Sequence, residues 1–389
     1  MLGGVKMARI LIAGAGVGGL STAHRLRRLL PRTEEIVVFD QSPVHTFWPS
    51  LLWLMTGTRQ APDVVRPLAQ LREAGIRVVQ SPITAIVPAE KTLVTADQSW
   101  SGDALVIALG ADVDSGAIPG LAEVPGNFYT VAGAQAVWQQ LHDIEQGRII
   151  VLISRVPFKC PAAPYEAAML IDGALRKRRR RDAFEIEVWA AEAAPMAVAG
   201  PAVSQAVVDA LAHRDIRYHP NHTVDRVDYA ARQLIFKERQ DSVPYDLLAY
   251  VPPHCVPPVV TAAGLAPLGG WVAVDRHTLE TVYPNVFAIG DVTGIPLALG
   301  KPLPKAGVFA YRQGEVVAET IAARLLGRPS AETFDGQGEC FIEMGQGVAG
   351  FARGNFYAEP TPTIRAYRSG RHWHAGKVAF ERQWWARWW

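Results

Sequence analysis

A glycine-rich turn near the N-terminus constrains the fold of this chain more than any other feature. The segment ARILIAGAGVGGLSTAHRLRR predicts a strand, a tight turn and a helix, with Gly14, Gly16 and Gly19 in a G-x-G-x-x-G pattern. A second strand, EIVVFD, ends at Asp40. These glycines allow a pyrophosphate to approach the helix N-terminus, and the acid accepts hydrogen bonds from a ribose. The pattern therefore predicts dinucleotide binding; the alternative is a turn that only packs strand against helix.

Composition limits the remaining possibilities. The chain has 389 residues, of which 49% are hydrophobic and 20% charged, so we expect a globular protein of two or three domains. A net charge of +2 argues against nucleic acid as a partner. Cys160, Cys255 and Cys340 are too few for a disulfide scaffold, so each is a candidate reactive thiol. We expect no secretory signal, no transmembrane helix and no metal site.

Two later segments favour FAD as the bound dinucleotide. ETVYPNVFAIGDVTG, with Gly290 and Asp291, resembles the second flavin signature of the two-dinucleotide-binding flavoproteins. In that superfamily the aspartate binds the ribityl chain of FAD. ALVIALGA, which contains Gly110, resembles the short linker by which the chain leaves the FAD domain. Together with the N-terminal loop, these segments predict that FAD rather than NAD occupies the first site.

The segment RVPFKCPAAPYE follows a clean strand, GRIIVLI, at the place where a second phosphate-binding loop would be expected. It contains no glycine, and its prolines lack backbone donors. NADH is therefore not the expected reductant. A thiol at Cys160 that faces the first domain could instead reach a flavin ring. Its candidate partner is Cys340, 180 positions later, and the two could form a redox disulfide over the flavin.

The chain resembles the sulfide:quinone oxidoreductases and the related flavocytochrome c sulfide dehydrogenase flavoproteins. KCPAAPYE matches the K-C-P-x-x-P-Y-E segment of that family. TFWPSLLWLMTGTR is similar to its segment along the flavin, with Pro49 and Ser50, and KPLPKAGVFAYRQGEVVA contains Lys305, whose counterpart approaches the flavin pyrimidine end. The resemblance implies sulfide oxidation to polysulfide or sulfur by a Cys160–Cys340 pair. Electrons would pass through FAD to a membrane quinone.

The resemblance also implies roles for single residues. Cys340 would lie nearer the flavin, and Glu166 would handle the proton of sulfide, although it could equally be a carboxylate at a helix N-terminus. Lys159 and Lys305 would favour negative charge on sulfur and on the reduced flavin. Some family members carry an additional cysteine, in places attached to FAD; its absence here predicts non-covalent FAD. We expect Cys255 to be a small buried thiol without a redox role.

The C-terminal sequence KVAFERQWWARWW suggests a membrane surface. Tryptophan and arginine suit the bilayer interface, so we expect a peripheral, monotopic enzyme; the alternative is a helix that docks on the protein's own core. The membrane residues would be Phe380, Trp384, Trp385, Trp388 and Trp389. The candidate quinone contacts are Phe351, Phe356 and Tyr357. Lack of a signal favours the cytoplasmic face, and the sequence leaves a homo-oligomer open.

These motifs predict an α/β protein with two Rossmann-like domains and a C-terminal membrane-interface extension. Residues 1–110 and 245–325 would form the FAD domain, 111–244 a second, NAD-domain-like insert, and 326–389 the extension. VDRVDYAARQLIFK would form a hairpin within the insert. The run RKRRRR would end a helix in solvent, or alternatively contact anionic lipid.

Two other functions fit the same motifs. One is a soluble flavocytochrome-type sulfide dehydrogenase subunit, which would pass electrons to a cytochrome. The other is a non-catalytic protein that keeps FAD and a disulfide for redox sensing. A type II NADH:quinone reductase fits less well, because the second glycine loop is missing.

Overall fold

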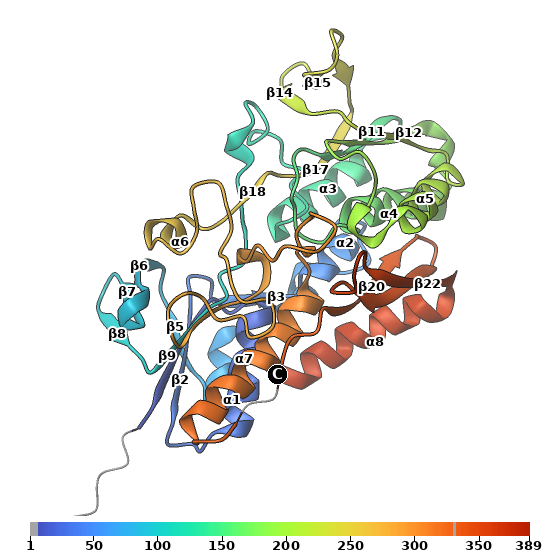
Figure 1. The fold of residues 1–389 in the computed structure, drawn as a ribbon. Helices are drawn as coiled ribbons and strands as arrows, with labels where there is room; N and C mark the ends of the chain where they lie inside the picture. The colour runs from blue at the N-terminus through green and yellow to red at the C-terminus, as the bar shows by residue number, and fades with distance from the viewer. Residues whose placement is uncertain (1–6, 330–331) are drawn as a thin grey trace, which may run out of the picture.

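In this computed structural model, which describes residues 7–329 and 332–389, two parallel sheets form the centres of two domains (Figure 1). The first sheet contains, in spatial order, β19 (Val286–Ala288), β9 (Ala104–Ile107), β1 (Arg9–Ala13), β2 (Glu35–Asp40) and β5 (Arg77–Gln80). Helices α1 (Val17–Leu29) and α7 (Gly307–Leu325) pack side by side against it. Strand β19 and helix α7 thus come from residues 286–325 and join the N-terminal strands after an insert.

The second sheet is also parallel and confirms the Rossmann-like insert. Its spatial order is β13 (Ile216–His219), β12 (Phe184–Ala190), β11 (Gly147–Ile153) and β17 (Leu247–Val251), with α3 (Val131–Asp143), α4 (Ala163–Lys177) and α5 (Pro201–Ala212) as its helices. The predicted boundary after residue 244 was placed too early, because β17 belongs to this sheet. All five residues of β17 are buried, and an apolar run of this kind fits either sheet.

Short antiparallel units surround the two sheets. The predicted hairpin is confirmed as β14 (Val224–Asp228) and β15 (Gln233–Phe236), which β16 (Val243–Pro244) extends. The smaller units are β3 (Val44–Thr46) with β4 (Val65–Pro67), β6 (Ile83–Val87) with β7 (Thr92–Thr95) and β8 (Ser99–Ser101), β10 (Asp112–Val113) with β18 (His254–Cys255), and β14 (Val224–Asp228) with β15 (Gln233–Phe236) and β16 (Val243–Pro244). A short helix, α6 (Pro258–Ala262), precedes the return to the first sheet. The C-terminal part contains β20 (Gln337–Glu343), β21 (Ala349–Asn355), β22 (Thr363–Gly370) and α8 (Arg371–Trp388).

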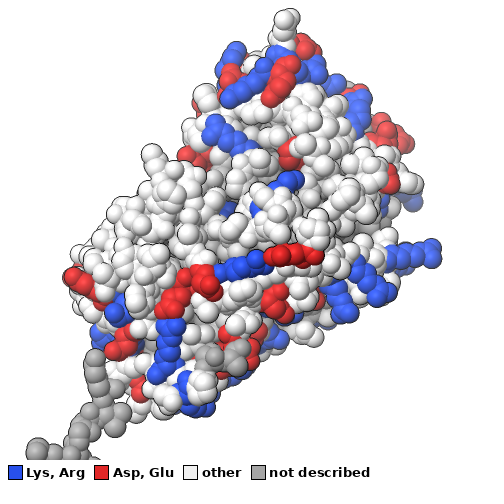
Figure 2. Space-filling model, viewed as in Figure 1, with Lys and Arg blue, Asp and Glu red and all other residues white. Residues whose placement is uncertain are grey.

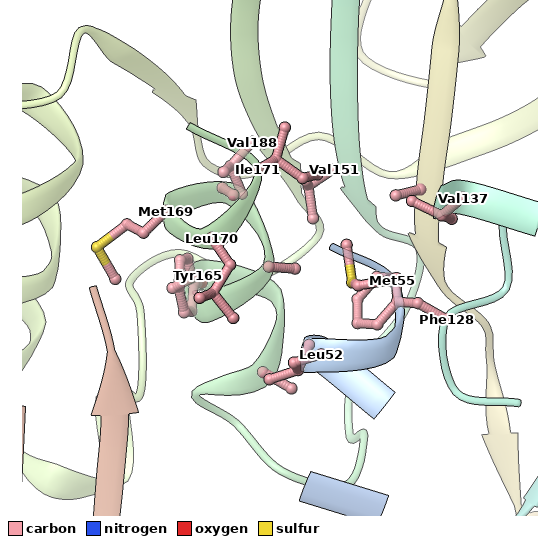
Figure 3. Close-up of a cluster of buried hydrophobic side chains, with 14 of the residues drawn as sticks. Leu52, Met55, Phe128, Val137, Val151, Tyr165, Met169, Leu170, Ile171 and Val188 are labelled. Carbon is pink, nitrogen blue, oxygen red and sulfur yellow. The ribbon is translucent and has the colours of Figure 1, made fainter. Parts of the chain in front are cut away.

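The two domains share a hydrophobic core. Helix α2 (Leu51–Leu54) belongs to the N-terminal segment, yet its apolar side chains pack under the second sheet. Figure 3 shows Leu52 and Met55 among Phe128, Val137 and residues of α4. Because apolar burial stabilises by about 25 cal/mol per Å², separating the domains would expose a costly surface. The loop between β11 and α4 is therefore held at a fixed distance from the first domain.

Helix α8 runs along β20 to β22 and ends beside α1 and α7 (Figure 1). Trp384 and Trp388 are buried, and the Trp384 Nε1–H donates to His45 Nε2 at 3.2 Å. The expectation that these two tryptophans lie at a membrane is wrong, and the alternative of a helix docked on the protein's own core holds for them. An apolar helix face looks the same in sequence whether lipid or protein covers it.

The charged residues of α8 explain why this face points inward. Glu381 is 5% exposed; it forms an ion pair of 2.6 Å with Arg59 and accepts a hydrogen bond of 2.5 Å from the Ser50 hydroxyl. Phe380, on the outer side, is 41% exposed, and Trp385 and Trp389 are half-buried. Among residues 7–329 and 332–389, no helix has the length and apolarity needed to cross a bilayer.

The arginine run at the end of α4 is largely tied to its own domain. Arg181 is buried, and its guanidinium pairs with Asp172 at 2.7 Å. Arg176 pairs with the same carboxylate at 2.9 Å. This pairing favours the interpretation as a structural helix end over lipid contact. Charges of both signs are mixed at the ends of the face shown in Figure 2, whereas its middle is mostly uncharged.

We predict that Trp384→Ala destabilises the whole protein. It removes a buried ring that lies 5.3 Å from Phe47 and leaves the buried His45 without its indole donor. The expected loss in the free energy of unfolding is about 3–5 kcal/mol, measured by urea denaturation. The control Arg382→Ala, on the exposed side of the same helix, should change it by less than about 0.5 kcal/mol. Equal stabilities would mean that α8 does not dock as described.

Candidate active site

A cavity of about 1830 Å³ lies between the two domains and is closed on its third side by the C-terminal sheet and α8. The glycine loop forms one wall. Gly14 has a φ of +103°, and a Cβ there would lie 2.3 Å from the carbonyl oxygen of Ala108. Gly14 and Gly16 line the cavity, whereas Gly19 does not. A Cβ at Gly19 would lie 1.9 Å from the Gly14 oxygen, so this glycine permits close packing of helix on strand.

Asp40 lies at the carboxyl end of β2 and also lines the cavity. Its carboxylate accepts backbone N–H bonds of 2.8 Å from Ala15 and from Ser42. Burial raises the pKa of Asp40, and these two hydrogen bonds oppose that shift. The two donors hold the carboxylate at the position where a ribose hydroxyl would meet it.

Asp291 and Lys305 lie at the other end of the dinucleotide site. Gly290 has a φ of +74°, which turns the chain so that Asp291 faces the cavity. The Oδ1 atom of Asp291 is buried without a hydrogen-bond partner among the described residues. Lys305 Nζ donates to the carbonyl oxygens of Asp291 at 2.7 Å and Thr293 at 3.0 Å. Burial lowers the pKa of Lys305 to about 8, and Asp291 partly opposes this.

These observations fit a bound flavin dinucleotide. The glycine cradle has no room for a side chain, as a pyrophosphate site requires. The orphaned Asp291 oxygen is a buried acceptor that lacks the hydroxyl donor a ribityl chain would supply. Pro49 and Gly110 line the same cavity, as predicted. Ser50 does not, because its hydroxyl donates to Glu381; its predicted cofactor contact is therefore wrong.

The loop between β11 and α4 brings a thiol to the first domain. The backbone N–H of Cys160 donates to the carbonyl oxygen of Lys305 at 2.7 Å. Cys160 has a φ of +55°, a left-handed conformation that is costly for a residue with a side chain. The adjacent Lys159 places its ammonium 4.3 Å from the centre of the Trp48 ring. The cysteine is thus held next to Lys305 of the first domain.

Cys340 lies on β20 and lines the same cavity as Cys160. Both are half-buried free thiols in this structure, and their exposed atoms face the cavity. The pKa of Cys160 is raised to about 12, chiefly by burial and then by the Glu166 carboxylate, while Lys377 acts to lower it. Burial likewise raises the pKa of Cys340 well above its ordinary value, and Cys160 adds to this. Lys377 is the nearby cation that favours the thiolate form of both.

Glu166 and Lys377 form a buried ion pair beside the two thiols. Glu166 is 2% exposed, and its Oε1 accepts hydrogen bonds of 2.7 Å from Lys377 Nζ and from the Glu343 N–H. Glu166 lies in the first turn of α4, which fits the alternative that it is a carboxylate at a helix N-terminus. It also lines the cavity. The sequence interpretation missed Lys377. One signal was available, because Lys377 precedes Trp384 by seven residues and so shares its buried helix face.

The predicted quinone contacts are partly corrected. Phe356 lines the cavity, but Phe351 and Tyr357 do not. Phe351 stacks on Trp373 with ring centroids 4.3 Å apart, and the Tyr357 hydroxyl donates to the Arg276 carbonyl at 2.8 Å. The apolar residues that line this end of the cavity instead are Phe341, Ala352, Ile364 and Phe380. Phe341 and Phe351 are partners across β20 and β21, and the sequence alone did not give this pairing.

Cys255 is the third cysteine, and the expectation that it is buried is wrong. It is exposed on β18, paired with Asp112 of β10, and does not line the cavity. The pKa of Cys255 is raised by partial burial and also by the nearby carboxylates of Asp112 and Asp114. Its position outside the cavity agrees with the predicted lack of a redox role.

The fold and this dinucleotide site define a flavoprotein oxidoreductase. The pyridine nucleotide-disulphide oxidoreductase family matches residues 8–153 and 166–314, so the chain belongs to this family and is a flavin-dependent oxidoreductase. The match is interrupted between these ranges, in the segment that carries Cys160.

Similar proteins narrow the class. The mitochondrial sulfide:quinone oxidoreductase of Mus musculus is 25% identical, with 91% of this chain and 80% of the relative covered. The sulfide-quinone reductase of Aquifex aeolicus is 27% identical, with 96% and 89% covered. A crystal structure of the sulfide:quinone oxidoreductase from Aquifex aeolicus superimposes with a TM-score of 0.88 at 25% identity, covering 98% of this chain and 91% of that one.

We predict that Gly14→Ala loses the flavin while the chain still folds. The added methyl group would lie 2.3 Å from a backbone oxygen, so the loop must move away from the pyrophosphate position. A tenfold fall in flavin content of the purified protein, read from its visible absorbance, corresponds to about 1.4 kcal/mol. Gly264→Ala is the matched control, because Gly264 also has a positive φ, of +70°, but nothing within 4 Å. Full flavin in Gly14→Ala would contradict the assignment of this wall.

Proposed function

We propose that this protein oxidises sulfide to polysulfide or sulfur and passes the electrons through non-covalent FAD to a quinone. One observation carries the proposal: Cys160 and Cys340 line one cavity with the Glu166–Lys377 pair, beside the Asp291 and Lys305 end of the dinucleotide site. The names of the similar proteins support the same chemistry.

When bound, FAD would supply the two-electron redox chemistry that links sulfur to the quinone. Gly14 and Gly16 would receive its pyrophosphate, and Asp40 a ribose. Asp291 would accept a ribityl hydroxyl, and Lys305 would lie at the pyrimidine end. The binding is non-covalent because Cys160 and Cys340 are required for sulfur chemistry and Cys255, the only other cysteine of the sequence, lies outside the cavity.

The side chains support a disulfide-exchange step. The sulfur of hydrosulfide forms a bond to one cysteine of the oxidised pair, and the Cys160–Cys340 bond breaks. The other cysteine leaves as a thiolate and keeps the electron pair; Lys377 stabilises its charge. Glu166 takes the proton of the bound sulfur, because its carboxylate lines the same cavity. With a flavin bound to accept the electron pair, a new bridge would form between the two cysteines through the added sulfur, and a further sulfide would open this bridge and lengthen the sulfur chain.

The second domain is poorly suited to NADH. Glu192 follows β12, at the place where a second nucleotide's ribose would bind, but its carboxylate accepts the Tyr165 hydroxyl instead. Tyr165 comes from the same segment as Cys160. The loop Val156–Pro161 also has two prolines where backbone N–H donors would be needed. Both features support sulfide rather than NADH as the electron donor.

A quinone ring would enter from the aromatic side of the cavity. Phe341, Phe356 and Phe380 offer it apolar contacts there, and Phe380 is also exposed at the surface. The exposed Trp48 lines the cavity as well. We propose that these surface aromatics bring the opening to a membrane, with the protein bound peripherally, since exposed rings partition into the headgroup region.

The first prediction of this proposal concerns the cysteines. Cys160→Ser and Cys340→Ser should each keep bound flavin and lose at least about 100-fold in sulfide-dependent reduction of a short-chain quinone, because disulfide exchange is removed. Cys255→Ser should keep the parental rate. Substantial activity in either of the first two variants would refute the cysteine-pair mechanism.

The second prediction concerns the electron donor. Anaerobic sulfide should bleach the flavin band and a quinone should restore it, whereas NADH at the same concentration should leave the band unchanged. Rapid bleaching by NADH would indicate an NADH:quinone reductase. Bleaching by sulfide without recovery on adding quinone would instead favour a redox-sensing protein.

A further inference from the structure

A line of buried titratable groups leads away from the cysteines toward the surface. It begins at Glu166, which pairs with Lys377 Nζ at 2.7 Å. The next member is Glu343 of β20, whose backbone N–H donates to Glu166. Burial lowers the pKa of Lys377, but the carboxylates of Glu166 and Glu343 raise it more. Both Glu343 carboxylate oxygens lie 3.0 Å from Nδ1 of His374. The His374 side chain is 34% exposed, so the line ends at solvent.

This arrangement is more than packing requires. Glu343 is 1% exposed and Lys377 5% exposed, and burying ionisable groups costs free energy unless they are paired. The Trp53 ring of α2 lies beside both side chains, with Lys377 Nζ 5.3 Å and the His374 ring centre 6.1 Å from the centre of the Trp53 ring. The rest of the line is enclosed by α4, β20 and α8. Glu166 and Lys377 face the cavity, Glu343 is enclosed by protein, and His374 reaches the surface.

We propose that Lys377, Glu343 and His374 form the proton outlet of the sulfur site. The inference rests on the proposed function, because that reaction releases a proton when hydrosulfide bonds to a cysteine sulfur. Glu166 receives this proton; the Lys377 ammonium gives one of its own protons to the Glu343 carboxylate and takes the proton of Glu166 in its place. The His374 imidazole, 3.0 Å from the Glu343 carboxylate, then delivers the proton to solvent. The electron pair takes a different route, from the cysteine thiolate to the flavin and the quinone. His374 does not touch sulfur and acts only through Glu343.

The test uses the full-length flavin-loaded protein in weak buffer. Anaerobic sulfide is mixed rapidly with enzyme while the flavin band and a pH-indicator dye are followed together. His374→Gln should slow proton release and flavin bleaching by about tenfold or more, within the range that a positioned proton-transfer group contributes. Millimolar imidazole should restore both rates, because the small base can replace the lost ring. Melting temperature and bound flavin should match those of the parent.

His372→Gln is the matched control, since His372 is an exposed histidine on the same helix whose ring contacts Trp373 rather than the buried line. It should keep parental rates with and without imidazole. Glu343→Gln, which keeps the shape of the side chain, should slow both signals as His374→Gln does.

Three outcomes would overturn the outlet. The first is an unchanged rate in His374→Gln, and the second is a loss that imidazole does not restore. The third is a loss of rate that is accompanied by a lowered melting temperature in both His374→Gln and Glu343→Gln, because this would indicate a structural role. If sulfide fails to bleach the flavin of the parent protein, the proposed function itself is wrong. If sulfide bleaches the parent and His374→Gln at the same rate, only the proton outlet is wrong.

Discussion

The buried ion pair between Glu166 and Lys377 is the interaction on which the active site depends. It joins α4 of the second domain to α8 of the C-terminal part. The backbone N–H of Glu343 on β20 donates to the same Glu166 carboxylate. Removing one partner of a buried pair costs about 3–5 kcal/mol, because the other charge is left uncompensated. The pair therefore fixes the two elements that carry Glu166 and Lys377 next to the strand that carries Cys340.

A second constraint sets the distance between thiol and cofactor. Cys160 belongs to the second domain, but its N–H is bonded to Lys305 of the first, and Lys305 is bonded to the carbonyl of Asp291. The shared core around α2 keeps the two domains from separating. Direct attack of a thiolate on a flavin would need the reacting atoms about 3–3.5 Å apart, so a rigid joint suits this chemistry better than a hinge.

Burial shifts the pKa values of the thiols and of the amine that line the cavity in opposite directions. It raises the pKa of both cysteines and lowers that of Lys305, so each group is driven toward its neutral form. Lys377 is the exception, because two carboxylates keep its pKa raised. The site thus retains one firm positive charge where a leaving thiolate would form. The same low polarity strengthens the attraction between that charge and sulfur.

The sequence alone determined the parts that rest on local chemistry. The glycine spacing, the acid after the second strand, the GD segment and the cysteine-proline segment predicted both Rossmann-like domains, the flavin and Cys160 at its edge. These features depend on backbone conformation and short-range spacing, so they can be recognised in the sequence without the tertiary structure. The alternation of strands and helices also located most of the elements, although β17 was assigned to the wrong domain because a buried apolar strand carries no mark of its partner.

The tertiary structure alone decided what each amphipathic face covers. In sequence, the tryptophans of α8 fit lipid and protein equally well; only the positions of Arg59 and Ser50 beside Glu381, and of His45 beside Trp384, show that this face is buried in the protein. The roles of Lys377, Glu343 and His374 were hidden for the same reason. Their partners lie far away along the chain, and the burial that makes such pairs matter exists only after folding.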